Sequence, residues 1–289
     1  MDKQKATTQT PTISTGRDEA LAALQRTVVT PETFTAIRQV TEAVIAPDGS
    51  RAAFVVGEWV DEQKKQRKRI WRAELAGGEV LPCTSGPTAD TSPAWSPDGA
   101  FLAFVSRGEE NESKPQLYVL PADGKEQRQV CTMPEGVSSI SWSPDGTRIA
   151  FLSRYGDKPG NDPIVLSEQG RHQRLWTVRL DSDTPEPVTP DGISIWNYSW
   201  SSDCQQFAVY YATGPEETDW YRGQIGLVSS RGGLVRQISQ LTRQAWNLSW
   251  SPDSKRIAYI SGEWSDPDRG GGEVFVHTLE SGKVHNLTP

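Results

Sequence analysis

The side chains that most often do chemistry are sparse in this chain of 289 residues. It contains three histidines and three cysteines: His172, His277, His285, Cys83, Cys131 and Cys204. Neither set has the spacing of metal ligands, because no HExxH motif and no paired CxxC motif occurs. The cysteines are also too few for a disulfide framework, and the sequence has no Gly-rich phosphate loop. We therefore expect no catalytic residue, no cofactor-binding residue, no metal ligand and no cofactor.

Acidic residues offer two further kinds of candidate site. Asp266–Gly270 (Asp-Pro-Asp-Arg-Gly) has the form of half a calcium loop, but the twelfth loop position is His277 rather than a bidentate acid. We interpret it as a loop between strands. Two glutamate pairs, Glu109-Glu110 and Glu216-Glu217, lie in polar stretches where solvated charge normally collects.

Charge and hydropathy exclude several classes of partner. The chain has 30 Lys and Arg against 37 Asp and Glu, a net charge of −7, which argues against nucleic acid. The basic run Lys64–Arg69 lacks interleaved aromatic residues, and we expect it at a solvated hairpin tip, in the loop between the first repeat's second and third strands. The longest apolar run, Phe207–Ala212, is too short to cross a membrane. With no signal-peptide core in the first thirty residues, we expect a cytoplasmic protein.

The elements that would position these side chains come from a repeat, which also accounts for the 25 Gly, 20 Pro and 11 Trp. The motif Trp-Ser-Pro-Asp-Gly occurs five times, either complete or with some residues replaced: at Ala46–Gly49, Trp95–Gly99, Trp142–Gly146, Trp200–Cys204 and Trp250–Ser254. The third residue of the motif falls at 47, 97, 144, 202 and 252, so the steps are 50, 47, 58 and 50 residues.

Each repeat predicts four short strands. In the Ser-Pro-Asp-Gly turn, Pro presets φ, Asp bonds the backbone two residues on, and Gly supplies a positive φ. The following runs, such as Ile149–Leu152, are continuously apolar, which is typical of strands covered on both faces. Because no helical crossovers are visible, the strands must be antiparallel. The sequence predicts an all-β fold, a β-propeller of four-stranded antiparallel blades with the Trp residues packed between them. We expect a disordered leader over 1–29 and a propeller over 30–289, with blades at about 38–84, 91–132, 137–190, 195–240 and 245–289.

The phrase Ser-Pro-Asp-Gly-x-x-[Ile/Leu]-Ala-Phe, followed by runs such as Leu117–Leu120, resembles the TolB-like, WD-type propeller repeat. Thr30–Phe34 and the closing stretch through Asn286–Pro289 are similar to the propeller of the prolyl oligopeptidase family, in its acylaminoacyl-peptidase and dipeptidyl aminopeptidase branch. Members carry an α/β-hydrolase domain with a Gly-x-Ser-x-Gly motif and more blades, and that motif is absent here. The resemblance therefore implies a truncated propeller without its catalytic domain. It also suggests the two glutamate pairs as candidates to grip a substrate amine, as in dipeptidyl peptidases.

Three functional hypotheses follow. The resemblance favours the non-catalytic propeller portion of a serine peptidase, which gates peptide access to a catalytic α/β-hydrolase domain and docks it. The alternative is a stand-alone TolB-like scaffold that binds a protein or peptide. A five-bladed enzyme acting on carbohydrate would need carboxylates that converge from several blades, whereas the first strands begin with small or apolar residues, as at Val137–Ser139.

Overall fold

The computed structural model of the chain describes residues 37–60, 65–85, 89–108, 114–124, 126–155, 171–263 and 271–289, without the side chains of Lys65 and Gln66. From Gln39 to Pro289 the chain forms one compact unit. The predicted leader over 1–29, the pair Glu109-Glu110 and the loop Asp266–Gly270 lie outside the described residues.

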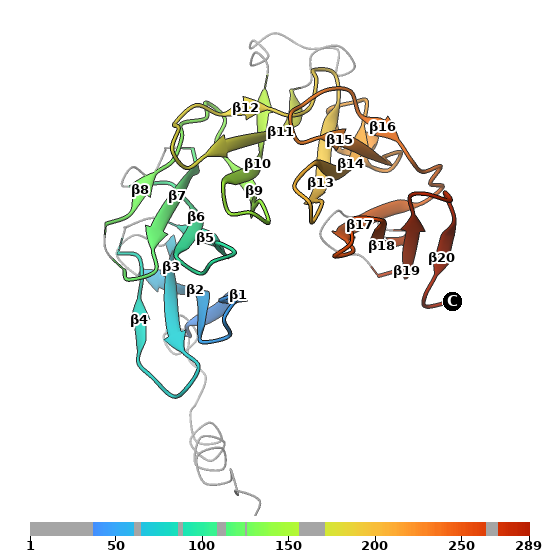
Figure 1. The fold of residues 1–289 in the computed structure, drawn as a ribbon. Helices are drawn as coiled ribbons and strands as arrows, with labels where there is room; N and C mark the ends of the chain where they lie inside the picture. The colour runs from blue at the N-terminus through green and yellow to red at the C-terminus, as the bar shows by residue number, and fades with distance from the viewer. Residues whose placement is uncertain are drawn as a thin grey trace, which may run out of the picture. The chain divides into compact units, whose positions relative to one another are not determined.

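The described chain forms five four-stranded antiparallel sheets, as the repeat predicted (Figure 1). We name them blades 1 to 5. Blade 1 contains β1 (Gln39–Ile45), β2 (Arg51–Val60), β3 (Lys65–Glu74) and β4 (Val80–Pro82). Blade 2 contains β5 (Asp90–Trp95), β6 (Phe101–Ser106), β7 (Gln116–Pro121) and β8 (Arg128–Gln129). Blade 3 contains β9 (Ser138–Trp142), β10 (Arg148–Tyr155), β11 (His172–Arg179) and β12 (Glu186–Pro187).

Blade 4 contains β13 (Ser194–Trp200), β14 (Gln206–Ala212), β15 (Gln224–Ser229) and β16 (Arg236–Gln237). Blade 5 contains β17 (Gln244–Trp250), β18 (Arg256–Gly262), β19 (Glu273–Thr278) and β20 (Val284–Asn286). A short helix, α3 (Glu217–Trp220), lies between β14 and β15. In every blade the strands pair in chain order, so each blade is a simple meander.

The Ser-Pro-Asp-Gly turns fold as their residue types predict. In blade 2, Oδ1 of Asp98 accepts hydrogen bonds from Oγ of Ser96 at 2.5 Å and from the Ala100 amide at 3.0 Å. The same pair of bonds recurs at Asp145, Asp203 and Asp253. The carboxylate therefore ties both sides of each turn together and fixes the register of the first two strands.

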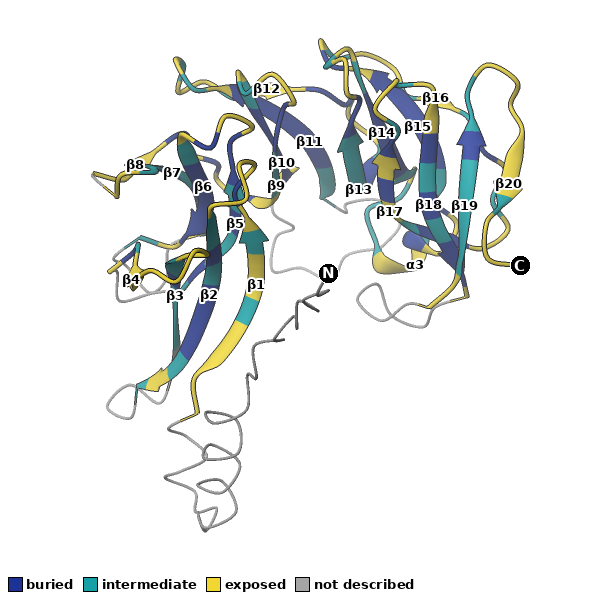
Figure 2. Cartoon of the chain, turned by 60° about the horizontal axis from the view of Figure 1, so that its bottom comes forward, coloured by how far each residue is buried: buried dark blue, intermediate teal, exposed yellow. Residues whose placement is uncertain are grey.

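The core lies between consecutive blades. Among the described residues, four clusters of buried apolar side chains join blades 1 and 2, 2 and 3, 3 and 4, and 4 and 5. Figure 2 shows the central strands β6, β10 and β14 as largely buried. The repeated tryptophans Trp95, Trp142, Trp200 and Trp250 are all at most 9% exposed. Their predicted packing between blades is confirmed.

The basic run differs from its prediction. We expected Lys64–Arg69 in a loop, but β3 begins at Lys65, which pairs with Val60 of β2. The ten-residue β2 extends the ladder through this segment, and the Arg67 guanidinium bonds the Glu58 carboxylate across it. The loop prediction was wrong because cross-strand pairing of opposite charges stabilises a hairpin.

Candidate functional site

The connections of each blade lie at two opposite edges of its sheet. In a four-stranded meander, the loop between strands two and three and the link to the next blade leave at one edge, which we call the loop edge. The Ser-Pro-Asp-Gly turns and the connections between strands three and four lie at the other, the turn edge. The loop edge of blades 3 and 4 gathers α3 and several charged or aromatic side chains, so it is the candidate functional site.

Helix α3 presents the predicted glutamate pair at this edge. The Glu216 amide donates to Oδ2 of Asp219 at 3.0 Å, and the Asp219 amide donates to the Glu216 carbonyl at 2.9 Å. The Trp220 side chain is fully buried, and its carbonyl accepts a hydrogen bond from the Tyr210 hydroxyl at 2.7 Å. Glu216 is half-buried and Glu217 is exposed. The helix is therefore fastened to blade 4 and holds both glutamates in fixed backbone positions.

His172 lies at the start of β11 at the same edge. Its Nδ1 is 3.1 Å from Oγ of Ser194. Burial lowers the pKa of His172, while the charges of Asp191 and Asp219 oppose that shift. A Ser–His contact is the beginning of an acyl-transfer site, but Ser194 is only 1% exposed. A substrate carbonyl cannot reach that hydroxyl, so the contact positions the ring rather than activating a nucleophile.

The other two histidines occupy ordinary strand positions. His277 is buried in β19, and burial lowers its pKa. His285 is an exposed residue of β20.

Arg174 is the least expected member of the site. It is 8% exposed, and its Nε donates to the Thr189 carbonyl at 2.9 Å while its Nη1 pairs with Oδ1 of Asp191 at 2.6 Å. Its guanidinium carbon lies 5.2 Å from the Tyr155 ring centroid and 5.3 Å from that of Trp176. A buried charge is costly unless it is paired in this way. In the sequence, Arg174 is distinguished only as one Arg inside an apolar strand.

A second group of charges lies on the blade 2 side of this edge. The Glu135 carboxylate, in the link between blades 2 and 3, is 2.6 Å from the Arg171 guanidinium and 3.7 Å from the Lys114 ammonium. The Tyr155 ring is 52% exposed beside them. Together with α3, the loop edge offers carboxylates for a cationic group and aromatic surface for an apolar one.

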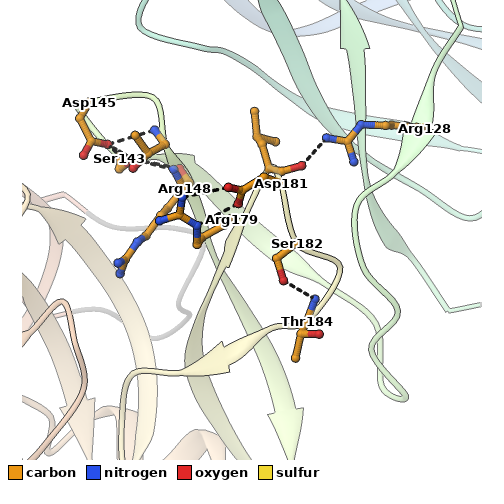
Figure 3. Close-up of polar contacts among 10 residues, drawn as sticks. Arg128, Ser143, Asp145, Arg148, Arg179, Asp181, Ser182 and Thr184 are labelled. Atoms are coloured by element: carbon orange, nitrogen blue, oxygen red, sulfur yellow. Dashed lines mark hydrogen bonds and ion pairs between the residues drawn. The ribbon is translucent and has the colours of Figure 1, made fainter.

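The turn edge of blade 3 is held by its own polar network (Figure 3). Arg179 pairs with the Asp181 carboxylate through Nε at 2.9 Å and Nη2 at 3.0 Å. Arg128 of blade 2 donates from Nη2 to the Leu180 carbonyl at 2.7 Å. The Arg128 bond fastens the β11–β12 turn to blade 2, and the Arg179–Asp181 pair holds the turn itself.

Metal-ligating groups and thiols are dispersed among the described residues. No set of three His, Cys, Asp or Glu residues in the described ranges is placed to hold a metal ion. The three cysteines are unpaired with one another, and burial raises the pKa of the Cys131 thiol to about 12, which makes it a poor nucleophile. No helix in the described part of the chain is long and apolar enough to cross a membrane.

Similarity to known proteins agrees with the fold. Residues 35–218 match the family described as the TolB beta propeller domain. The chain belongs to this family. Its match to the peptidase YuxL of Bacillus subtilis, whose own activity is uncharacterised, is 30% identical over 232 residues, 80% of this chain and 31% of YuxL. The chain spans about a third of the length of the curated relatives it matches.

Two solved propellers share the fold. The acylaminoacyl peptidase of Pyrococcus horikoshii has a TM-score of 0.64 at 15% identity, over 88% of this chain and 40% of the peptidase. A TolB from Agrobacterium tumefaciens has a TM-score of 0.59 at 19% identity, over 86% of this chain and 80% of TolB. The propeller thus resembles both those of peptidases and TolB itself, as the repeat phrase indicated.

Proposed function

We propose that this chain is the non-catalytic propeller portion of a serine peptidase of the prolyl oligopeptidase type. In this role the loop edge of the propeller holds a peptide and contacts an α/β-hydrolase domain. The observation that carries the proposal is the 30% identity to the peptidase YuxL over 80% of this chain. No Gly-x-Ser-x-Gly motif occurs in the sequence, so the chemistry must come from another domain.

The geometry of the loop edge supports recognition of a peptide end. A free peptide amine carries a positive charge at neutral pH, and Glu216 and Glu217 supply two consecutive carboxylates at the start of a helix that is fastened to blade 4. The exposed Tyr155 ring offers apolar surface on the neighbouring blade. Charge-assisted hydrogen bonds to carboxylates are among the stronger polar contacts. We therefore assign the amine-binding role to the pair on α3.

The test uses the full chain and short peptides. We expect calorimetry to detect binding of a tripeptide with a free amine, and to find at least a tenfold loss when the peptide is N-acetylated or when both glutamates are replaced (Glu216→Gln with Glu217→Gln). Glu280→Gln is the matched control, because Glu280 is an exposed glutamate in the β19–β20 turn, at the opposite edge. Equal affinity for free and acetylated peptides would refute the amine site.

A second candidate, a stand-alone TolB-like scaffold, is favoured by the coverage of the Agrobacterium TolB, which reaches 80% of that chain. A scaffold of this kind binds a segment of a protein rather than a peptide end. The same titration separates the two proposals, because a scaffold would bind acetylated and free peptides with similar affinity and would be insensitive to the glutamate substitutions.

A further inference from the structure

A cavity of about 310 Å³ lies at the turn edge between blades 3 and 4. We call it the 3–4 cavity. Three arginines from three segments line it: Arg148 at the start of β10, Arg179 at the end of β11 and Arg231 in the β15–β16 turn. The Trp200 indole forms part of its wall. Asp145 is the one acidic residue among the described residues that line it.

The same place in the repeat is filled between blades 1 and 2. Arg51, the first residue of β2, corresponds to Arg148, the first residue of β10. The Arg51 guanidinium lies 5.0 Å from the Trp95 ring centroid, and it donates to the Gly99 carbonyl at 3.3 Å and to the Ala122 carbonyl at 3.5 Å. The Arg51 side chain therefore occupies this position between blades 1 and 2 and bonds to the backbone of blade 2.

Between blades 3 and 4 the corresponding residues line an open space instead. Trp200, Cys204 and Ser230 stand where blade 2 has Trp95, Gly99 and Ala122, and all three face the 3–4 cavity. The Arg148 guanidinium makes no hydrogen bond or ion pair with any residue that the structure describes. The Arg148 guanidinium therefore faces the cavity, whereas the equivalent Arg51 guanidinium is held by contacts with blade 2.

The acidic residues near the cavity already accept hydrogen bonds or pair with an arginine. Oδ1 of Asp145 accepts from Oγ of Ser143 at 2.6 Å and from the amide and hydroxyl of Thr147 at 3.0 and 2.9 Å (Figure 3). Arg179 is neutralised by Asp181. Arg231, like Arg148, has no side-chain partner among the described residues and is exposed on its turn. The guanidinium groups of Arg148 and Arg231 thus face one cavity without a hydrogen-bond partner among the described residues. The Asp145 carboxylate, whose charge interacts with that of Arg148, supplies one negative charge to the same wall.

We propose that the 3–4 cavity binds an oxyanion, a carboxylate or phosphate group, between the guanidinium groups of Arg148 and Arg231. Planar guanidinium groups match the geometry of both oxyanions and bind them through paired N–H groups. The Ser230 and Gln205 side chains add polar atoms to the wall, and the Trp200 indole offers a flat surface to the body of a ligand. This site lies at the edge opposite to α3, so it is independent of the proposed peptide role.

The experiment titrates the full chain with sodium phosphate and, separately, with sodium succinate, each against sodium chloride at equal ionic strength. Thermal unfolding and calorimetry report binding, because a ligand that binds only the native state raises the melting temperature. We expect saturable binding of at least one of the two anions, and at least a tenfold weaker affinity in both Arg148→Gln and Arg231→Gln. The anion that binds more tightly identifies the carboxylate or the phosphate source.

Arg51→Gln is the matched control, because it removes the equivalent arginine between blades 1 and 2. We expect this substitution to change the anion affinity of the 3–4 cavity by less than twofold. Arg231→Gln guards against a folding defect, since Arg231 is an exposed turn residue. The proposal is overturned if chloride reproduces the effect at equal ionic strength, if neither anion binds, or if the folded Arg231→Gln variant binds as tightly as the unaltered chain.

Discussion

The repeated tryptophans provide an internal comparison of one hydrogen bond. Nε1 of Trp142 donates to the Ala94 carbonyl of the preceding blade at 2.9 Å, and Nε1 of Trp250 donates to the Ser199 carbonyl at 3.0 Å. Nε1 of Trp200 is buried without an acceptor among the described residues. All three rings are 7–9% exposed and end the first strand of their blade. Replacing each Trp by Phe therefore removes similar volume but a different polar contact.

We expect Trp142→Phe and Trp250→Phe to destabilise the chain more than Trp200→Phe. Each of the first two loses a hydrogen bond with a net value of about 1 kcal/mol, whereas Trp200→Phe removes an unsatisfied buried donor that costs about 1–3 kcal/mol. These two effects add, so the difference in unfolding free energy between the bonded variants and Trp200→Phe should be about 2–4 kcal/mol.

Urea unfolding followed by circular dichroism at neutral pH measures this difference, with the slope of each transition checked for equality so that the midpoints compare free energies. A loss in Trp200→Phe that equals or exceeds the losses in both bonded variants would refute the account of how the blades are joined.

Two further predictions concern the backbone and the turns. Gly136→Ala should destabilise the chain strongly and Gly49→Ala only modestly: both glycines have positive φ (80° and 71°), but an added Cβ at Gly136 would lie 2.8 Å from the Pro115 carbonyl oxygen, whereas Gly49 has open space. Equal unfolding midpoints for the two variants would contradict this. Hydrogen bonds from Ser96 and the backbone lower the pKa of Asp98 in the fold, so its contribution is present above the unfolded pKa of about 3.9 and is lost as pH falls through the lower folded pKa. Asp98→Asn should therefore flatten the loss of stability between about pH 5 and pH 2, measured by urea unfolding at several pH values; an unchanged slope would show that the turn carboxylate does not contribute.

The strand pattern could be predicted from the sequence because the information is local. The Ser-Pro-Asp-Gly phrase forms a hairpin through hydrogen bonds of its own side chains. The neighbouring apolar runs, such as Ile149–Leu152, indicate strands that are covered on both faces. The burial of Trp142 and its counterparts followed from the same repeat.

The candidate site depended instead on contacts between blades. The partners of Arg174 lie 15 to 17 residues away in the next blade link, and His172 meets Ser194 only because β11 packs beside β13. No spacing in the sequence records that packing. Likewise, the four-residue helix α3 is too short to show a helical period. The 3–4 cavity also depends on how blade 3 packs against blade 4, because its lining comes from both blades.

We propose that this propeller binds a peptide by its free end and performs no hydrolysis itself. The most direct measurement gives the purified chain a dipeptidyl or acyl-aminoacyl chromogenic substrate and a tripeptide with a free amine, and records hydrolysis and binding in the same preparation. The account predicts saturable binding of the tripeptide, lost in the Glu216→Gln, Glu217→Gln double variant, with no release of chromophore. Turnover that co-purifies with the chain through repeated removal of host peptidases, or binding that ignores the two glutamates, would contradict it.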